Sequence, residues 1–298
     1  ANAKLYAKKV IDSPYKLYTT KKGQWSAYQQ LFMGDNGENG ASVEAIFPIL
    51  QDGLKTTSYG TTLYLMAGSN DNSEHIKSAT IAGNSTTGGW AGNRMRPDLV
   101  LKFFPNNDAP NVAAYAMPAA ADDDRALFDG EGRNVSNGDD EKGVKVFTNG
   151  FSVCKFNNFK TDGSAGHNSL FPDADFFLMR AAEAYLMYAE ADARQNNGTT
   201  TAQGTAYINA LRTRANATTQ TAYSLRQICD EWSREFYFEG LRRTTLIRFG
   251  YFGGNVNYNW SWKGGVKNGR NFDSHLNLFP IPTSDMVANS NLIQNTGY

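Results

Sequence analysis

The chain has 298 residues, of which 41% are hydrophobic and 19% charged, enough apolar material for one or two cores. Its 29 basic and 29 acidic residues give a net charge of zero, which argues against a nucleic-acid partner, because phosphate binding needs a concentrated basic face. No apolar run approaches the roughly 20 residues that a membrane-spanning helix requires. The two cysteines, Cys154 and Cys229, are expected to be buried apolar side chains, with a disulfide left open.

The first twelve residues have apolar side chains at positions 3, 7, 10 and 11, which is the stripe of a helix. The helix starts without a capping residue, a signal peptide or a cysteine that could carry a lipid. We therefore expect residues 1–12 to be the end of a helical part that begins outside this chain.

Residues 13–174 are rich in turn signals such as Asn39-Gly40 and Asn149-Gly150. This pattern predicts a lobe of loops with few regular elements. Arg96-Pro97-Asp98 predicts a short helix through about residue 104. Short strands are predicted at residues 43–49, 61–66, 145–148 and 151–156, with Asn149-Gly150 joining the last two as a hairpin.

From residue 175 onward the periodicity is helical, apart from a second loop stretch at 250–279. Ser224 and Gln227 form a capping-box pattern, Gly240 is expected in a left-handed turn, and Thr283 is expected to cap a last short helix. The remaining helices are predicted at residues 175–194, 202–215, 224–238 and 241–249.

Charged residues on these helices contain enough carboxylates for a glycosidase pair, but their acids and bases are balanced. We therefore expect structural ion pairs between packed helices. The residues concerned are Arg180, Glu183, Glu190, Arg234, Glu235, Glu239, Arg242 and Arg243. The three histidines lie far apart and do not have the spacing of a zinc site. Asp122, Asp123 and Asp124, followed by Asp129 and Glu131, leave calcium open as a ligand, although their spacing is not that of an EF-hand.

Four blocks in a fixed order resemble the C-terminal half of the SusD/RagB family. They are Met179–Ala191, Ile208–Ala215, Glu235–Arg243, and the closing Leu278–Asp285 with Ile293–Tyr298. Residues 7–17 are also similar to the segment that ends the N-terminal helical half of that family. The resemblance implies a mainly α fold, a tetratricopeptide-like helical scaffold with a loop-rich lobe carrying short strands. The expected divisions are 1–12, a ligand-binding lobe at 13–174, and the scaffold at 175–298.

Members of this family are surface lipoproteins that capture glycans, or peptides in some cases, for a TonB-dependent transporter. The resemblance thus implies a non-catalytic protein on the outward face of the outer membrane, without a cofactor. Its partners would be a glycan and a SusC-like transporter, and a lipid on the N-terminal part outside this chain would anchor it. A peptide-capturing RagB-like protein and a glycoside hydrolase are kept as alternatives.

Aromatic residues in loops are the candidate ligand contacts, because sugar rings stack on exposed Trp and Tyr side chains. Trp90 lies among glycines that would leave its ring uncovered, and Asn93 and Arg94 follow it. Tyr59, Tyr64 and Asn70 lie in a nearby loop and are the other candidates. The remaining tryptophans, Trp25, Trp232, Trp260 and Trp262, are expected to pack in the scaffold.

Overall fold

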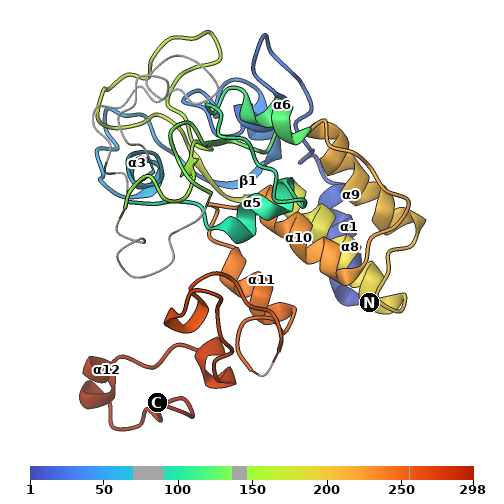
Figure 1. The fold of residues 1–298 in the computed structure, drawn as a ribbon, viewed down its shortest axis with the longest axis vertical. Helices are drawn as coiled ribbons and strands as arrows, with labels where there is room; N and C mark the ends of the chain where they lie inside the picture. The colour runs from blue at the N-terminus through green and yellow to red at the C-terminus, as the bar shows by residue number, and fades with distance from the viewer. Residues whose placement is uncertain (70–89, 91, 136–145, 255) are drawn as a thin grey trace. The chain divides into compact units, whose positions relative to one another are not determined.

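The computed structural model describes residues 1–69, 90, 92–135, 146–254 and 256–298 (Figure 1). They form two compact units, Ala1–Glu239 and Gly240–Tyr298, which are described separately below. Among these residues, no helix combines the length and the apolar character that crossing a membrane requires.

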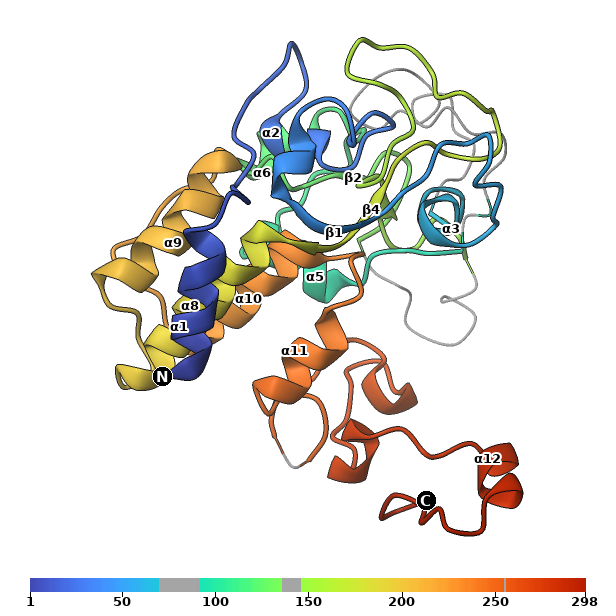
Figure 2. The same ribbon diagram turned by 180° about the vertical axis from the view of Figure 1, so that it is seen from behind.

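The first unit contains a layer of four helices that lie side by side (Figures 1 and 2). They are α1 (Asn2–Ile11), α8 (Ala181–Gln195), α9 (Ala202–Arg214) and α10 (Leu225–Phe236). Helix α8 packs against the other three, and its buried face is lined by alanines such as Ala182 and Ala189, whose small side chains allow close approach. The predicted helices at 1–12, 202–215 and 224–238 are therefore confirmed, and so is the mainly α class.

The start of α10 shows why this helix could be located from the sequence. The Ser224 hydroxyl accepts a hydrogen bond from the backbone N–H of Gln227, and the Gln227 side chain accepts one from the Ser224 backbone at 2.8 Å. This reciprocal capping box satisfies two end amides. Ile228 and Trp232 follow on the buried face, as the sequence predicts.

Residues 176–180 are a strand, which corrects the prediction of a helix from residue 175. Strand β4 (Phe176–Arg180) pairs antiparallel with β1 (Ala45–Ile49), from Ala45 opposite Arg180 to Ile49 opposite Phe176. The run of apolar residues before α8 is compatible with the periodicity of a helix and with that of a strand. Pairing with β1 decides the outcome, because it satisfies the backbone while burying Phe177 on the inner face.

The remaining elements of the first unit are short and are joined by long loops. Among its described residues they are α2 (Ala27–Gln30), η1 (Ala41–Glu44), α3 (Thr61–Ala67), α5 (Pro97–Phe103), α6 (Met117–Ala121), β2 (Phe128–Asp129) and β3 (Ser152–Val153). Helix α5 confirms the prediction for residues 96–104. The strand predicted at 61–66 is wrong, because Leu63, Met66 and Ala67 are buried at the spacing of a helix.

The hairpin predicted around Asn149-Gly150 is also wrong. Residue 145 lies outside the described residues, and residues 146–148 form no strand. Strand β3 pairs instead with β2, about twenty residues earlier in the chain. Two arginine side chains donate to four carbonyls of this segment, Arg94 to Val146 and Asn149, and Arg133 to Phe147 and Gly150, and the Thr148 carbonyl accepts from the backbone of Asn134. A strand ladder is not needed where side chains supply the hydrogen bonds.

Two apolar clusters lie beneath these loops. One gathers Tyr28, Leu31, Phe32 and Phe177, and the other gathers Phe103, Phe128, Phe151 and Tyr237 together with smaller residues. Trp25 and Trp232 are buried, as expected. Cys154 and Cys229 are buried free thiols, which confirms the simpler of the two expectations.

The second unit contains α11 (Arg242–Arg248), η2 (Lys263–Gly265), η3 (Ser274–Asn277) and α12 (Thr283–Ala288). Gly240 has the predicted left-handed conformation, with φ of +79°. Thr283 is the first residue of α12 and makes no capping hydrogen bond, so its predicted capping role is wrong. Trp260 packs against Phe252 and Phe272, in agreement with a scaffold role.

Candidate functional site

Tyr64, on α3, and Trp90, which is bonded to the end of α3, form an exposed pair of aromatic rings. Their ring centroids are 6.3 Å apart and their planes are inclined by 55°. Tyr64 is 52% exposed and Trp90 is 48% exposed, whereas Leu63 and Met66 on the other side of α3 are buried. The backbone of Trp90 donates a hydrogen bond of 2.7 Å to the carbonyl of Ala67, the last residue of α3. The helix thus holds both rings at the surface.

Asn93 is fixed beside this pair by a close approach to Gly68. Its backbone N–H donates to the Gly68 carbonyl at 2.6 Å. A Cβ atom at residue 68 would lie 2.6 Å from the side-chain nitrogen of Asn93, so the contact requires a glycine there. The Asn93 side chain is half-buried. Its expected role in ligand binding stays a prediction.

Arg94 holds the segment that begins at Val146 by hydrogen bonds to its backbone. Its guanidinium donates to the carbonyls of Val146 and Asn149 and lies 5.5 Å from the ring centre of Phe147, which is 57% exposed. Burial lowers the pKa of Arg94, and the neighbouring Arg133 lowers it further. Direct contact between Arg94 and a ligand stays a prediction, beside this structural role.

The other two predicted residues have different outcomes. Asn70 lies outside the described residues. Tyr59 is exposed and packs edge to face on Phe171, with ring centroids 5.4 Å apart. The sequence analysis did not single out Phe171 and Phe147, because their immediate neighbours include Leu170 and Val146 and lack the glycine-rich pattern around Trp90.

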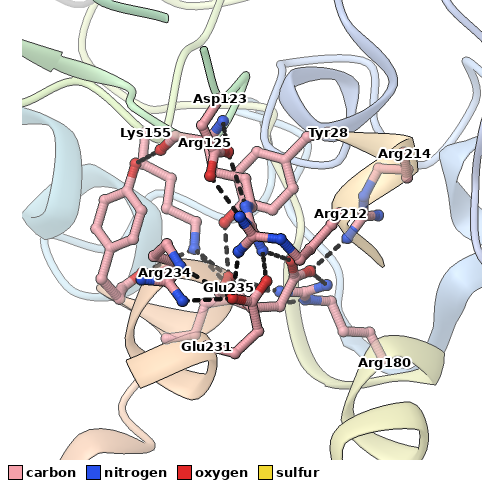
Figure 3. Close-up of polar contacts among 12 residues, drawn as sticks. Tyr28, Asp123, Arg125, Lys155, Arg180, Arg212, Arg214, Glu231, Arg234 and Glu235 are labelled. Atoms are coloured by element: carbon pink, nitrogen blue, oxygen red, sulfur yellow. Dashed lines mark hydrogen bonds and ion pairs between the residues drawn. The ribbon is translucent and has the colours of Figure 1, made fainter. Parts of the chain in front are cut away.

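Beneath the lobe lies a buried network of ion pairs, drawn in Figure 3. Arg180, at the junction of β4 and α8, donates to Glu44 at 2.8 Å, to Glu235 at 2.7 Å and to Glu239 at 2.7 Å. Arg125 donates to Asp123 at 2.8 Å and to Glu231 at 2.7 Å. The other cations of the network are Lys155 on Glu239, Arg214 on Glu44 and Glu235, and Arg212 and Arg234 on Glu231.

The charges of this network hold each other in the ionised form. Burial acts to raise the pKa of Glu235, but Arg214, Arg180 and Arg125 outweigh it and lower the pKa to about 2. Burial lowers the pKa of Lys155 to about 8, against the opposing effect of Glu239. Every carboxylate in the network is thus bonded to an arginine or a lysine, an arrangement that locks segments together.

The predicted structural ion pairs are confirmed for Arg180, Glu235 and Glu239, whereas Arg234 pairs with Glu231 within its own helix, α10. Glu190 is paired with Arg194 one turn away in the same helix. Arg243 donates to the carbonyls of Leu276 and Asn277 rather than to a carboxylate.

The calcium alternative finds no support in the geometry. The Asp123 carboxylate is bound by Arg125, and Asp129 accepts from the backbone of Ala114, with Arg133 at 3.8 Å. Over the part of the chain that the structure describes, three or more metal-binding side chains do not gather at any point.

A profile of the SusD family matches residues 43–298. The chain belongs to the SusD family. It is also 40% identical over 330 residues to the starch-binding protein SusD of Bacteroides thetaiotaomicron, an alignment that covers 100% of this chain and 56% of that protein. The chain therefore spans little more than half the length of this curated SusD-family relative.

Solved structures of SusD-like proteins share the fold. A surface glycan-binding protein A from Bacteroides thetaiotaomicron superposes with a TM-score of 0.60 at 20% identity, covering 99% of this chain and 59% of that chain. The same protein in complex with laminarihexaose gives 0.57 at 20% identity, covering 99% and 59%. A SusD-like protein from Bacteroides fragilis gives 0.61 at 18% identity, covering 99% and 61%.

Proposed function

We propose that this chain is the ligand-binding part of a non-catalytic cell-surface protein that captures glycans and passes them to a SusC-like TonB-dependent transporter. The Tyr64–Trp90 pair is the observation that carries this proposal. Membership of the SusD family supports the partner and a position on the outward face of the outer membrane. A lipid anchor would hold the protein at the membrane surface.

The exposed pair has the chemistry that a sugar requires. Aromatic faces cover the C–H faces of a pyranose ring, and rigid side chains lose little entropy when they bind. Because the two rings are inclined by 55°, they form a bent surface. A bent surface suits a curved glycan chain. Asn93, beside the pair, would supply hydrogen bonds to hydroxyl groups.

An α-glucan of the starch type is the ligand that we favour. The starch-binding relative aligns with the whole chain at 40% identity. The protein in complex with laminarihexaose is only 20% identical to this chain. The similarity therefore supports the shared fold, and its ligand is not carried over to this chain. Malto-oligosaccharides are therefore the first ligands to test.

The buried carboxylates argue for binding without hydrolysis. A glycosidase needs two carboxylates facing the substrate across a cleft. Glu44, Glu231 and Glu235 are buried and bound to arginines, so they cannot reach a ligand in this arrangement. A peptide ligand, the other alternative, would be favoured by charged or backbone-binding groups at the site, whereas the exposed groups at α3 are aromatic.

Calorimetric titration with maltoheptaose tests the proposal. Trp90→Ala and Tyr64→Ala should each weaken binding about ten-fold, the loss of one stacking contact of about 1–2 kcal/mol. Their melting temperatures should stay close to that of the parent chain, because both rings are half-exposed. Tyr115→Ala, which removes another exposed tyrosine, is the matched control and should bind normally.

Two results would contradict the proposal. Trp90→Ala could bind maltoheptaose as tightly as the parent chain, in which case the pair is not the site. Alternatively, incubation of the parent chain with maltoheptaose could release shorter sugars, in which case the protein is an enzyme.

A further inference from the structure

A second aromatic pair is formed by Tyr59, in the loop that leads into α3, and Phe171, in a distant segment of the chain. Their rings meet edge to face, with planes at 72° and centroids 5.4 Å apart. Tyr59 is 61% exposed, while Phe171 is half-buried. Phe171 therefore supports the tyrosine ring from one side and leaves most of its surface open to solvent.

The loop that carries Tyr59 is fixed by a single carboxylate. One oxygen of Asp52 accepts hydrogen bonds from the backbone N–H groups of Leu54, Lys55 and Thr56 at 3.0, 2.7 and 3.1 Å. These three bonds lower the pKa of Asp52 well below its ordinary value, so the carboxylate stays ionised. The loop is therefore held in one turn before the chain reaches Tyr59.

Gly53 allows the same loop to pack closely against the segment that carries Phe171. Its φ is +62°, and a Cβ atom there would lie 2.7 Å from the Phe171 carbonyl and 2.5 Å from the Asp173 carboxylate. Only glycine fits both the conformation and the contact. The two aromatic residues thus come from segments over a hundred residues apart that pack closely at Gly53 and Phe171.

The segment that carries Phe171 has its own supports. The side chain of Asn168 accepts from the backbone of Phe171 at 3.1 Å, and the backbone of Asp173 donates to Asn158 at 2.7 Å. Asp173 also lies 2.9 Å from Nδ1 of His167, whose side chain is 52% exposed. The other ring nitrogen of the exposed His167 is therefore a polar group that a sugar hydroxyl could use.

The second pair lies close to the first along the chain. Two extended residues and one helical turn separate Tyr59 from Tyr64, so their Cα atoms are at most about 12 Å apart. A glycan chain of several sugar units can span that distance. Since Tyr59, Tyr64 and Trp90 are all exposed, one glycan chain could contact both pairs.

We propose that Tyr59, supported by Phe171, forms a second subsite for the glycan that binds at Tyr64–Trp90, which makes the ligand an extended polysaccharide chain rather than a short sugar. This inference rests on the proposed function. Its distinguishing consequence is a dependence on ligand length, because a short oligosaccharide fills one pair and a longer one fills both.

Titration of the parent chain and Tyr59→Ala with maltotriose and maltoheptaose tests the inference. Tyr59→Ala should weaken binding of maltoheptaose about five- to ten-fold, the loss of one stacking contact, and leave binding of maltotriose unchanged. Tyr59→Phe keeps the ring and should bind both sugars as the parent chain does. Trp90→Ala should weaken binding of both sugars.

Each alternative outcome has a separate meaning. If Tyr59→Ala binds maltoheptaose normally while Trp90→Ala does not, the second subsite is overturned and the proposed function stands. If Tyr59→Ala weakens both sugars equally, Tyr59 belongs to the first site and the length dependence is overturned. If the parent chain binds neither sugar, both proposals fail for malto-oligosaccharides.

Discussion

Glu235 is the residue on which the buried network depends most, because it bonds to Arg125, Arg180 and Arg214 at once. Removing one partner from a buried ion pair leaves the other charges without compensation. Glu235→Gln keeps the shape of the side chain but removes the charge. The loss of stability in this variant should therefore come from broken buried ion pairs rather than from a cavity.

We expect Glu235→Gln to lower the free energy of unfolding by about 3–5 kcal/mol, as measured by urea denaturation. Asp12→Asn is the matched control, because Asp12 pairs with Lys8 on the exposed surface of α1 and should have no measurable effect. Equal effects of the two substitutions would contradict the structural role of the network.

The network also predicts how stability depends on pH. The pKa of Glu235 is about 2 in the folded chain against an ordinary value of 4.5, and that of Glu231 is also lowered. The unfolded chain therefore takes up protons first, so the stabilisation is complete above about pH 4.5 and is lost as the pH falls toward 2. Each carboxylate should contribute a slope of up to about 1.4 kcal/mol per pH unit.

Urea denaturation at a series of pH values between 5 and 2 measures this slope. Glu235→Gln cannot titrate at that position, so its free energy of unfolding should fall less steeply over this range than that of the parent chain. A variant curve parallel to the parent curve would show that the proton uptake occurs elsewhere.

At the scale of elements, the sequence predicts the helices well and the short strands poorly. Helix α10 begins at a capping box and buries a regular stripe, so local signals and packing agree. Residues 61–66 and 176–180 contain apolar runs too short for periodicity to decide, and burial or pairing with β1 decides their form. Residues 152–153 pair with 128–129, which lie far from them in the sequence, so no local pattern reveals this pairing.

The candidate site follows the same division. The glycine-rich sequence around Trp90 predicts that its ring is exposed. Tyr64 lies beside it because the backbone of Trp90 is bonded to the last residue of α3, the helix that carries Tyr64. The contact between Tyr59 and Phe171 joins distant segments, so the sequence alone could not reveal it.

Ser224 and Thr283, at the starts of α10 and α12, provide a matched test of helix capping. Ser224→Ala should lower the free energy of unfolding by about 1 kcal/mol, because the end amides of α10 lose their partner. Thr283→Ala should have little effect, because Thr283 makes no capping bond in α12. Thermal or urea denaturation measures both. An equal loss for the two variants would mean that the hydroxyl of Ser224 does not act as a cap.

At the scale of the whole molecule, the chain end is tied to a neighbouring segment of its own unit. The side chain of Gln294 exchanges two hydrogen bonds with the backbone of Ile281, at 2.8 and 2.9 Å. Asn295 donates to the carbonyl of Phe279, and the Tyr298 hydroxyl donates to that of Leu278. These bonds account for an ordered end, since terminal segments stay ordered only when they are held.

Deletion of residues 291–298 should therefore loosen residues 278–282. We expect faster amide hydrogen exchange and faster proteolysis in that segment, and a lower melting temperature for the second unit. Gln294→Ala alone should show part of the same change. Unchanged exchange in the truncated chain would mean that the last eight residues are dispensable.

The buried network also sets the smallest piece of the first unit that can fold. Its members come from residues as far apart as Glu44, Asp123, Lys155, Arg180 and Glu235. Cutting the chain between the loop-rich lobe and the helices would separate Glu44 from Arg180 and Arg214, and Lys155 from Glu239. It would also separate Arg125 from Glu231 and Glu235. The lobe fragment would then hold buried charges without compensation. We therefore expect the lobe and the helices to fold in one cooperative step, and the lobe expressed by itself to be an unfolded polypeptide.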